Sequence, residues 1–280
     1  MKEVQIIMFK KTLTVLLCSA FLVAGATAAN AAEKKVLRVG MECAAAPFNW
    51  SQSTTENGAV RIAGTNEYAN GYDVLISKML ADALGMELEV YKIEWDGLPP
   101  ALVTGKIDAV VASMAITEKR KQTVDFTVPY YYANTVALVR KDSEQAKAQS
   151  LADFSGARAT TQLNSVWYEL IDQIPGVVKL PALDNIPTAI VALQSGKCDV
   201  LVVDDPTAQA AEVANPDLLM LRFAEDKGFK TTAEHDVLGV AVKKGNTELR
   251  EAMNVVLSKL TDEDRAAIMS KAIRMQPLMQ

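Results

Sequence analysis

Residues 96–108 read DGLPPALVTGKID, and residues 184–199 read DNIPTAIVALQSGKCD. Each stretch combines a helix that begins near Pro, a Gly-Lys turn and an Asp that precedes an apolar strand. Ser113 follows the first Asp by five residues, and Asp204 follows the second Asp by five. Both residues therefore lie just past the C-terminal ends of corresponding strands, and ligands of open α/β sheets bind at that edge. Generic βα packing is the alternative, but the shared order of Pro, Gly-Lys and Asp favours two related units facing one cleft.

Apolar periodicity extends this βα rhythm over most of the chain. We expect strands at 35–41, 86–93, 107–112, 158–161, 177–180 and 200–203, and helices at 72–84, 98–103, 166–173, 187–194, 247–260 and 262–274. Alternating strands and helices predict the α/β class with mostly parallel sheets. Between Ser51 and Asn70 the chain is polar and contains Gly and Asn, which indicates a surface loop or hairpin.

Composition excludes several classes of protein. The chain has 280 residues, of which 50% are hydrophobic, a net charge of −5 and three Cys. It is too apolar to be disordered, too poor in Cys for a disulfide scaffold, and too acidic for a nucleic-acid binder. Its length favours two domains.

The first 31 residues have the pattern of an export signal. Phe9-Lys10-Lys11 precedes an apolar run from Leu13 to Ala26, and Ala29-Asn30-Ala31 is a small-x-small cleavage box. Met8 fits the start of such a peptide better than Met1, because Glu3 does not belong in a basic n-region. Cys18 lies within the apolar run, so we expect no lipobox. Cleavage after Ala31 removes three Lys and one Glu and changes the net charge from −5 to −7.

Complementary charges follow the two repeated strands. Thr117 is a natural N-cap for a short helix, and Arg120 in that helix can grip a carboxylate. Asp204 follows four apolar residues, where a carboxylate needs a partner such as an ammonium group. Arg120 could instead be a solvated charge, and Asp204 or Asp205 could simply cap the helix that begins at Pro206. Together, however, an Arg and an Asp on opposite walls complement an α-amino acid zwitterion.

Eight stretches, in this order and spacing, resemble the family 3 extracellular solute-binding proteins, the amino-acid receptors of ABC importers. They are Leu37-Arg-Val-Gly, Ala46-Pro-Phe, Gly71-Tyr-Asp-Val, Trp95-Asp-Gly-Leu, Gly105-Lys-Ile-Asp-Ala-Val, Ile116-Thr-Glu-Lys-Arg, Val124-Asp-Phe-Thr-Val-Pro-Tyr-Tyr and Leu238-Gly-Val-Ala-Val-Lys-Lys. The resemblance covers essentially all of the chain after the export signal.

The resemblance implies a type II periplasmic-binding-protein fold, with two α/β lobes joined by two hinge strands. Lobe 1 is expected to comprise residues 36–133 and 236–280, and lobe 2 residues 134–235. A monomer of this family would bind a free L-amino acid by hinge closure in the periplasm and deliver it to an ABC permease in the inner membrane. The resemblance implies no enzyme activity, and we expect no cofactor, metal or nucleic acid.

The resemblance also assigns binding residues. Arg120 would hold the ligand α-carboxylate with help from backbone groups of the turn before it, and Asp204 would bind the α-amino group. A loop of the second lobe, usually Gln-x-Gly-Thr-Thr, aligns with residues 162–166, where Asn replaces Gly and Ser replaces Thr. The residues expected from the turn and the loop are Ser113, Met114, Ala115, Thr117, Gln162, Asn164 and Ser165.

Two further residues bear on which amino acid would bind. Relatives often place an acid at the position of Glu42 and an apolar or aromatic wall at that of Trp95. An acid beside an aromatic face suits a guanidinium or ammonium group. We therefore expect a basic amino acid, arginine first, with a polar one such as glutamine as the alternative. Ala45 stands where several receptors of basic amino acids have Tyr.

The remaining reactive side chains give little support to an enzyme. Cys43 and Cys198 are expected to be free thiols, since a bridge between them would lock the hinge. His235 is the sole His and is expected at the surface or hinge, with no GxSxG, HExxH, CxxC, P-loop or GxGxxG motif in the chain. The alternative enzyme is an exported cyclohexadienyl dehydratase acting on arogenate or prephenate, with Glu42 or Asp205 as its acid. A receptor sensing domain is a third reading, but no signalling module is expected here.

Overall fold

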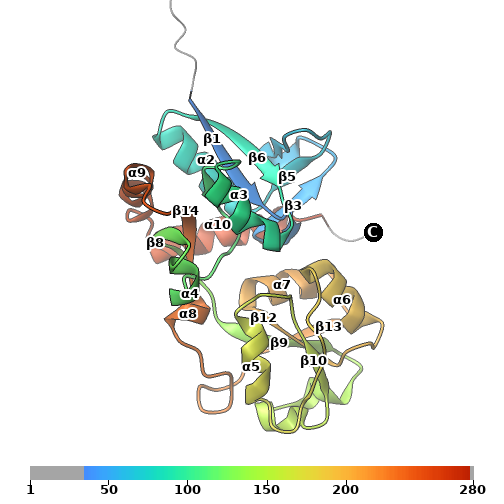
Figure 1. Cartoon of the computed structure of the whole chain (residues 1–280). Helices are drawn as coiled ribbons and strands as arrows, with labels where there is room; N and C mark the ends of the chain where they lie inside the picture. The colour runs from blue at the N-terminus through green and yellow to red at the C-terminus, as the bar shows by residue number, and fades with distance from the viewer. Residues whose placement is uncertain (1–34, 278–280) are drawn as a thin grey trace, which may run out of the picture. The chain divides into compact units, whose positions relative to one another are not determined.

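A computed structural model describes residues 35–277 (Figure 1). The predicted export signal, with Met8, Cys18 and the cleavage site after Ala31, lies outside these residues. No helix within the described range is both long and apolar enough to cross a membrane.

The first lobe is built on a five-stranded sheet with the order β6-β1-β7-β14-β8. Its strands are β1 (Val36–Met41), β6 (Glu87–Lys92), β7 (Ala109–Val110), β8 (Val124–Tyr132) and β14 (Val237–Lys243). β1 pairs in parallel with β6 and β7, whereas β14 is antiparallel to both β7 and β8. The prediction of parallel strands therefore holds for three of the five, and the antiparallel pair had no counterpart in the expected elements.

The helices of the first lobe are α2 (Tyr72–Ala83), α3 (Leu98–Thr104), α4 (Glu118–Lys121), α9 (Thr247–Leu257) and α10 (Asp262–Met275), with 3-10 turns at η1 (Glu56–Gly58) and η2 (Trp95–Gly97). They match the expected helices within a few residues. Together with the sheet, α2, α3, α9 and α10 bury one continuous apolar cluster that includes Leu37, Val39, Ile76 and Leu102, all 0% exposed. This cluster supplies the main stabilisation of the lobe.

The second lobe repeats the arrangement with the strand order β11-β10-β12-β9-β13. Its strands are β9 (Thr135–Arg140), β10 (Arg158–Thr160), β11 (Val178–Lys179), β12 (Val200–Asp204) and β13 (Leu218–Leu221). β10 is parallel to β11 and β12, and β9 is antiparallel to β12 and β13. The two sheets thus share one pattern, since in each of them three parallel strands are followed by one strand that is antiparallel to both of its neighbours.

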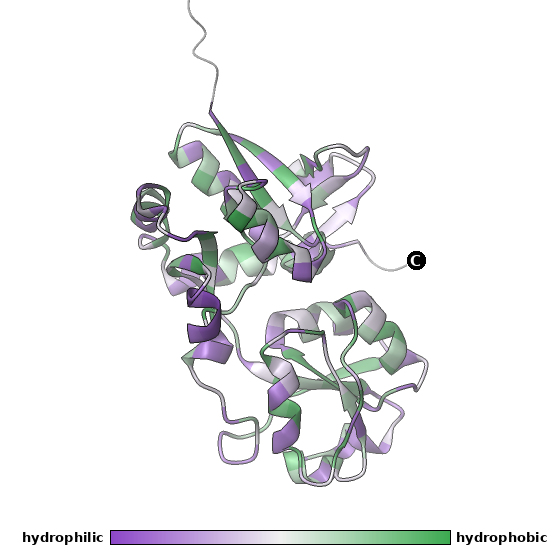
Figure 2. Ribbon diagram, in the orientation of Figure 1, coloured by the Kyte–Doolittle hydropathy of each residue, from purple (hydrophilic) through white to green (hydrophobic). Residues whose placement is uncertain are grey.

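Helices cover both faces of the second sheet. They are α5 (Trp167–Leu170), α6 (Ile186–Gln194) and α7 (Asp205–Ala214), with 3-10 turns η3 (Glu144–Lys147), η4 (Leu151–Phe154) and η5 (Ile171–Gln173), and α8 (Ala233–Asp236) follows this lobe. Along β12, Val200 and Val202 belong to one apolar cluster, and Leu201 and Val203 to another. Successive side chains of a strand point to opposite faces, so a strand covered on both sides is apolar throughout. Figure 2 shows the interior strands in green, while α4 and α8 are mostly purple.

The polar insert of residues 51–70, expected as a surface loop or hairpin, contains antiparallel strands of the hairpin kind. β2 (Ala44–Ala45), β3 (Asn49–Gln52), β4 (Val60–Arg61) and β5 (Tyr68–Asn70) form a small antiparallel sheet in the order β2-β3-β5-β4. Its central pairs are β3 with β5 and β4 with β5. The short strands lie beside the main sheet, and Ile62 bridges to Val90 of β6.

The chain passes between the lobes at two places. β8 of the first sheet leads through Ala133 and Asn134 into β9 of the second, and the segment after β13 leads through α8 into β14 of the first. Ala133 N–H donates to the Asp236 carbonyl over 2.9 Å, so the two connections lie side by side. This double crossing makes the first lobe discontinuous in sequence, whereas the second lobe is one continuous segment.

The internal repeat has a direct structural counterpart. Asp108 accepts hydrogen bonds from the Arg38 backbone N–H and from its guanidinium, at 2.9, 3.0 and 2.6 Å. Asp199 accepts the same set from Arg158, at 2.9, 2.9 and 2.8 Å. In the first lobe, the residue before β7 therefore binds β1, and in the second lobe the residue before β12 binds β10.

Candidate functional site

One pocket is lined by residues of both lobes and of the two connections between them. Its lining residues are Glu42, Trp95, Ser113, Ala115, Arg120, Ala133, Gln162, Ser165, Val166, Trp167, Asp204, His235 and Leu238. Eight of the eleven side chains expected at the site are among them. Met114, Thr117 and Asn164 do not line the pocket but hold segments that do.

The turn from Ser113 to Arg120 is fixed against the connection that returns to the first lobe. Ile116 N–H donates to the Val237 carbonyl, and Gly239 N–H donates to the Met114 carbonyl. A Cβ atom at Gly239 would lie 2.7 Å from Ile116 Cδ1, so a larger residue there would have to displace the Ile116 side chain. Met114 is 2% exposed and packs in the core of the first lobe, which is why its side chain does not reach the pocket.

Thr117 begins α4 and thereby places Arg120. Its hydroxyl oxygen accepts from the Arg120 backbone N–H at 3.1 Å, as the sequence predicts for an N-cap. The guanidinium of Arg120 donates to the Ala115 carbonyl at 2.8 Å. It lies 5.3 Å from the centre of the Trp95 ring. The Trp95 ring therefore supports Arg120 through a cation–π contact.

Arg120 is a half-buried cation, and the part of the chain that the structure describes places no acid beside it. Burial lowers the pKa of Arg120 to about 10, and no carboxylate among residues 35–277 opposes that effect. Its second donor goes to a neutral acceptor, the Asn164 carbonyl, at 3.2 Å. Because a guanidinium matches a carboxylate in shape and charge, an anionic group is the natural partner here.

Asp204 is a buried carboxylate at the end of β12. Its Oδ1 atom accepts from Thr207 N–H at 2.8 Å, so Asp204 is the residue that caps α7. Its neighbour Asp205 instead accepts from the Asn134 N–H at the crossing between lobes. Burial raises the pKa of Asp204 to about 7, which hydrogen bonding to Thr207 only partly offsets. Capping leaves Asp204 on the pocket wall without a cation beside it.

Glu42 lies just past the end of β1 and is 6% exposed. Its Oε1 atom accepts from Gln162 Nε2 at 2.8 Å, which joins the first lobe to the loop after β10 in the second. Burial raises the pKa of Glu42 to about 7, against the lowering effect of the Gln162 hydrogen bond. A buried acid with one amide donor can still accept from a cation.

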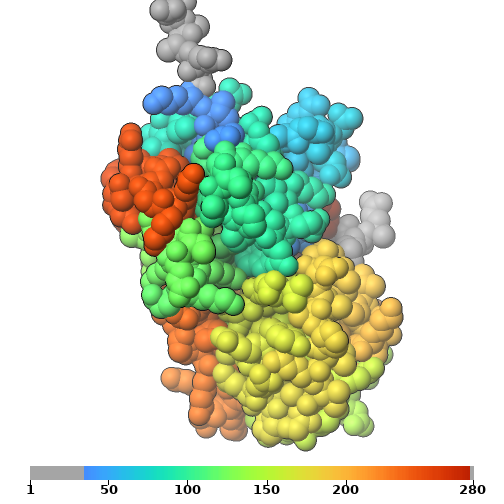
Figure 3. Space-filling model, viewed as in Figure 1, coloured from blue at the N-terminus to red at the C-terminus, as the bar shows by residue number. Residues whose placement is uncertain are grey.

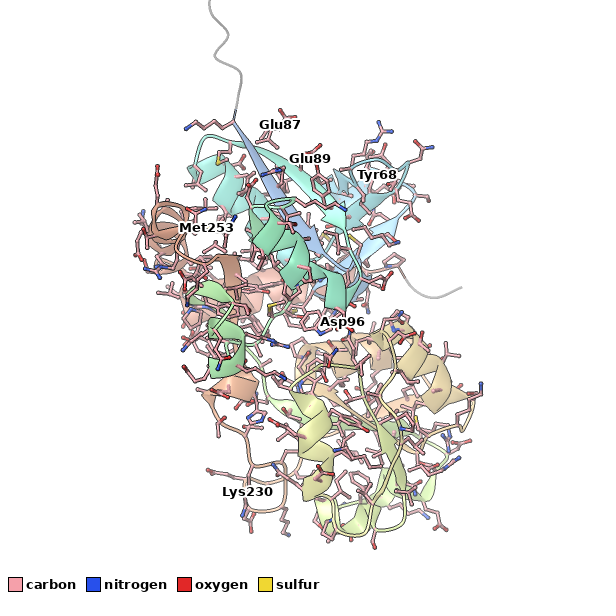
Figure 4. The ribbon with its side chains drawn as sticks, viewed as in Figure 1. Tyr68, Glu87, Glu89, Asp96, Lys230 and Met253 are labelled. Atoms are coloured by element: carbon pink, nitrogen blue, oxygen red, sulfur yellow. The ribbon has the colours of Figure 1, made fainter. Side chains whose placement is uncertain are left out.

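Asn164 binds the first lobe through three contacts. Its carbonyl accepts from Trp95 Nε1 at 3.4 Å and from Arg120, and its side-chain amide donates to Asp96 at 2.8 Å. Figure 4 labels Asp96 on the side of the first lobe that faces the second, and in Figure 3 teal and yellow side chains meet there. Asn164 has φ 55°, a left-handed conformation that Gly adopts freely and Asn tolerates.

The backbone is unusual at each of three strand ends around the site. Cys43, Ser113 and Asn164 have positive φ values of 54°, 46° and 55°, although none is Gly. They follow β1, β7 and β10, the strands whose ends approach the pocket. Such conformations persist where surrounding contacts enforce them, and they gather at functional sites.

Five lining residues were not among the expected site residues, and one of them, Val166, ends the 162–166 loop that was expected to contribute. Trp167 begins α5, whereas Ala133 and Leu238 belong to the connections between lobes. His235 was expected at the surface or hinge, and it lies at the hinge and also lines the pocket. Its Nδ1 atom accepts from Thr232 N–H, which leaves the proton on Nε2, 3.1 Å from Glu169 Oε1. In the sequence, only Trp167 carried a signal for the pocket, because it is an aromatic residue directly after the 162–166 loop.

Other chemistry finds little support in the described residues. Cys43 and Cys198 are both buried and unpaired, and burial raises the pKa of both thiols, that of Cys198 to about 11. Among residues 35–277, no cluster of His, Cys, Asp and Glu could hold a metal ion. The pocket instead offers one cation, Arg120, and two acids, Glu42 and Asp204. With both acids ionised, these three side chains sum to a charge of −1.

Comparison with known proteins places the chain in a family. Residues 37–274 match the model of the bacterial extracellular solute-binding proteins, family 3. The L-arginine-binding protein of Pseudomonas aeruginosa is 29% identical over 239 residues, which are 82% of this chain and 84% of that protein. The L-cystine-binding protein TcyJ of Escherichia coli K12 is 26% identical over 239 residues, 85% of this chain and 82% of that protein.

Solved structures agree with the sequence comparison. An amino acid ABC transporter substrate-binding protein from Streptococcus pneumoniae, bound to L-arginine, has a TM-score of 0.74 and 27% identity, covering 86% of this chain and 95% of that one. An ancestral arginine-binding protein bound to glutamine has a TM-score of 0.68 and 33% identity, covering 85% and 97%. The expected two-lobe periplasmic-binding-protein fold is confirmed, and the chain belongs to the bacterial extracellular solute-binding proteins of family 3.

Proposed function

We propose that this chain binds a free L-amino acid between its lobes, with a basic side chain preferred and arginine first. Arg120 binds the α-carboxylate, Asp204 binds the α-ammonium group, and Glu42 accepts from the cationic end of the side chain. Trp95 forms a wall of the pocket and supports Arg120.

Charge complementarity is the observation that carries this proposal. Glu42 and Asp204 are buried and Arg120 is half-buried in one pocket, and among residues 35–277 no oppositely charged side chain neutralises any of them. Buried charges without partners are costly, so a ligand that supplies the missing charges gains affinity. A zwitterion with a cationic side chain carries +1, which complements the pocket charge of −1. Glutamine pairs Arg120 and Asp204 equally well but leaves Glu42 without a cation.

We propose that the ligand is passed to an ABC permease in the inner membrane. Relatives of this chain are named as arginine- and cystine-binding proteins, and one solved relative as a substrate-binding protein of an amino acid ABC transporter. The predicted signal supports export to the periplasm, where the chain acts as a monomer. Residues 36–133 with 236–280 form one lobe and residues 134–235 the other, closing about the crossings at Ala133 and α8.

Calorimetric titration of the exported chain tests the proposal. Ligand carried through purification is removed by unfolding and refolding, after which L-arginine, L-lysine, L-histidine, L-glutamine and L-cystine are titrated separately. We expect arginine to bind most tightly and acetylated or amidated arginine to bind far more weakly, because each lacks one backbone charge. Equal affinity for arginine and glutamine would contradict the proposal that Glu42 accepts from the cationic end of the ligand side chain. A ligand that binds without any α-carboxylate would remove that of Arg120.

Incubation with prephenate and arogenate is the matched control for catalysis. A binding protein leaves both compounds unchanged, whereas a cyclohexadienyl dehydratase forms phenylpyruvate or phenylalanine. The assay uses the same refolded chain, so binding and turnover are compared on one sample.

A further inference from the structure

A chain of buried hydrogen bonds lies behind the turn that begins at Ser113. Ser113 N–H donates to the Tyr130 hydroxyl oxygen at 2.9 Å, and that hydroxyl donates to Asp73 Oδ1 at 2.7 Å. Asp73 Oδ2 accepts from Asn49 Nδ2 at 2.7 Å. Four elements of the first lobe therefore meet: the binding turn, β8, the start of α2 and β3.

Solvent does not reach the inner members of this chain. Tyr130, Asp73 and Asn49 are each 0% exposed. Asp73 lies in the first turn of α2, where the helix dipole favours a negative charge. Burial raises the pKa of Asp73 to about 6, and Tyr130, Asn49 and, more weakly, the Ser113 backbone N–H act in the opposite direction. A carboxylate held this way fixes the direction of the Tyr130 hydroxyl proton, so its oxygen lone pairs face Ser113.

Ser113 needs such support because its φ is 46°. A residue with a Cβ atom adopts this left-handed conformation reluctantly. The bond to Tyr130 stabilises it and directs the Ser113 N–H away from the pocket. Ser113 itself lines the pocket, and Arg120 lies at the far end of the same turn. A change in the Ser113 backbone would therefore shift the turn of residues 113–120 and, with it, the position of Arg120 in the pocket.

Tyr130 also sits close to the crossing between lobes. It belongs to β8, and Ala133, three residues on, lines the pocket. We propose that Tyr130 is a positioning residue of the amino-acid site, whose hydroxyl, oriented by Asp73, holds Ser113 in the conformation that shapes the ligand-binding turn. The role rests on the proposed function, since it acts through residues assigned to ligand binding.

Tyr130→Phe tests this role, and Tyr72→Phe is its matched control. Tyr72 is also 0% exposed, belongs to the same aromatic cluster, and donates its hydroxyl to the Tyr130 carbonyl at 3.0 Å. Tyr72→Phe removes one hydroxyl and its one hydrogen bond, whereas Tyr130→Phe removes the hydroxyl that accepts from Ser113 and donates to Asp73. We expect both variants to lose thermal stability, Tyr130→Phe more because it removes two bonds, and affinity for arginine and for glutamine to fall about tenfold in Tyr130→Phe alone. Unchanged affinity in Tyr130→Phe, or equal losses in both variants, would overturn the proposal.

Amide hydrogen exchange gives a readout that needs no ligand. In the unliganded protein, we expect the Ser113 amide to exchange slowly in the wild type and in Tyr72→Phe, and much faster in Tyr130→Phe. Unchanged exchange at Ser113 in Tyr130→Phe would overturn the positioning role even if affinity fell. If the wild type bound no amino acid, the proposed function would fail, while the exchange experiment would still show whether Tyr130 holds the turn.

Discussion

Gln162 Nε2 donates to Glu42 Oε1 over 2.8 Å, joining the loop after β10 in one lobe to the end of β1 in the other. Both side chains are at most 6% exposed. The bond orients the one acid that our proposal assigns to the ligand side chain. It also gives Glu42 a neutral partner, so the carboxylate can accept a ligand cation without first breaking an ion pair.

Glu42→Ala should weaken arginine binding by at least about 30-fold, or about 2 kcal/mol, because the guanidinium loses its counter-charge in a buried place. Glutamine affinity should change less than about threefold, since an amide needs no anion. Calorimetric titration of both ligands gives the ratio directly. Glu94→Ala is the control, because Glu94 is exposed and only adds to the field at Glu42. Equal losses for the two ligands would contradict a role of Glu42 in selectivity.

Binding of arginine should weaken below pH 7. Burial raises the pKa of both Glu42 and Asp204 to about 7, and both must be ionised to pair with the ligand cations. The ligand lowers these pKa values, so the complex holds fewer protons than the free protein, and affinity rises with pH until about pH 7 and then levels off. Titration at pH 6 in buffers of different ionisation enthalpy should show release of roughly two protons with arginine.

The number of protons released on binding glutamine is the comparison for the number released on binding arginine. It presents one cation, to Asp204, so we expect roughly one proton to be released. Glu42→Gln should lower the release with arginine by roughly one as well. A flat affinity profile for arginine between pH 5.5 and 8 would show that neither acid titrates on binding.

Asp204→Asn should separate stability from binding. Asn caps helices as well as Asp, so the bond from Thr207 N–H to position 204 is kept. The variant removes a buried charge that lacks a partner, so the ligand-free protein at pH 8 should unfold at the same temperature or higher. Affinity for every amino acid should nevertheless fall by about 100-fold or more, because the ligand ammonium loses its anion.

Glu212→Gln is the control for Asp204→Asn, since it removes one charge from the same helix, α7, away from the pocket. It should leave both affinity and unfolding temperature nearly unchanged. If Asp204→Asn bound arginine normally, Asp204 would be a helix cap alone, as one reading of its sequence allows.

The sequence indicated the parallel half of each sheet and missed the antiparallel half. β6 and β7 follow the helices α2 and α3 at short range, and β12 follows α6 in the same way, so their periodicity is local. β14 pairs with β7 and β8 from more than 100 residues away. Nothing in the local pattern reports such a pairing, because the partner strands are set by the return of the chain through the second crossing.

At the site, the sequence could predict which charged residues line the pocket, but not which residues from distant segments pack beside them. Arg120 and Asp204 follow equivalent strands, so spacing alone puts them on two walls of one pocket. His235 reaches the same pocket from the second crossing, where no motif surrounds it in the sequence. The N–H of Ser113 turns toward Tyr130, a partner 17 residues away that only the packing of β8 brings close.

The pairs Arg38–Asp108 and Arg158–Asp199 connect the repeat in the sequence to the stability of each lobe. In both pairs, one carboxylate accepts three N–H groups of the Arg, one of them from its backbone within β1 or β10. Arg158 is a strong enough partner to lower the pKa of Asp199 below its usual range. Such a set is worth more than a surface ion pair, since a lost acceptor also leaves a strand N–H without a partner.

Asp108→Asn and Asp199→Asn should each lower the free energy of unfolding by about 1–3 kcal/mol, because the amide turns two donors toward the guanidinium and loses the charge. Neither residue lines the pocket, so arginine affinity should stay within about threefold. Asp172→Asn is the control, since Asp172 is exposed and pairs only with Lys179 at the surface, where the loss should be about 0–1 kcal/mol. Urea unfolding of the three variants compares them directly. A loss for Asp108→Asn and Asp199→Asn no larger than for Asp172→Asn would show that the repeated Asp serves no structural purpose, and the shared spacing to Ser113 and Asp204 would then need another cause.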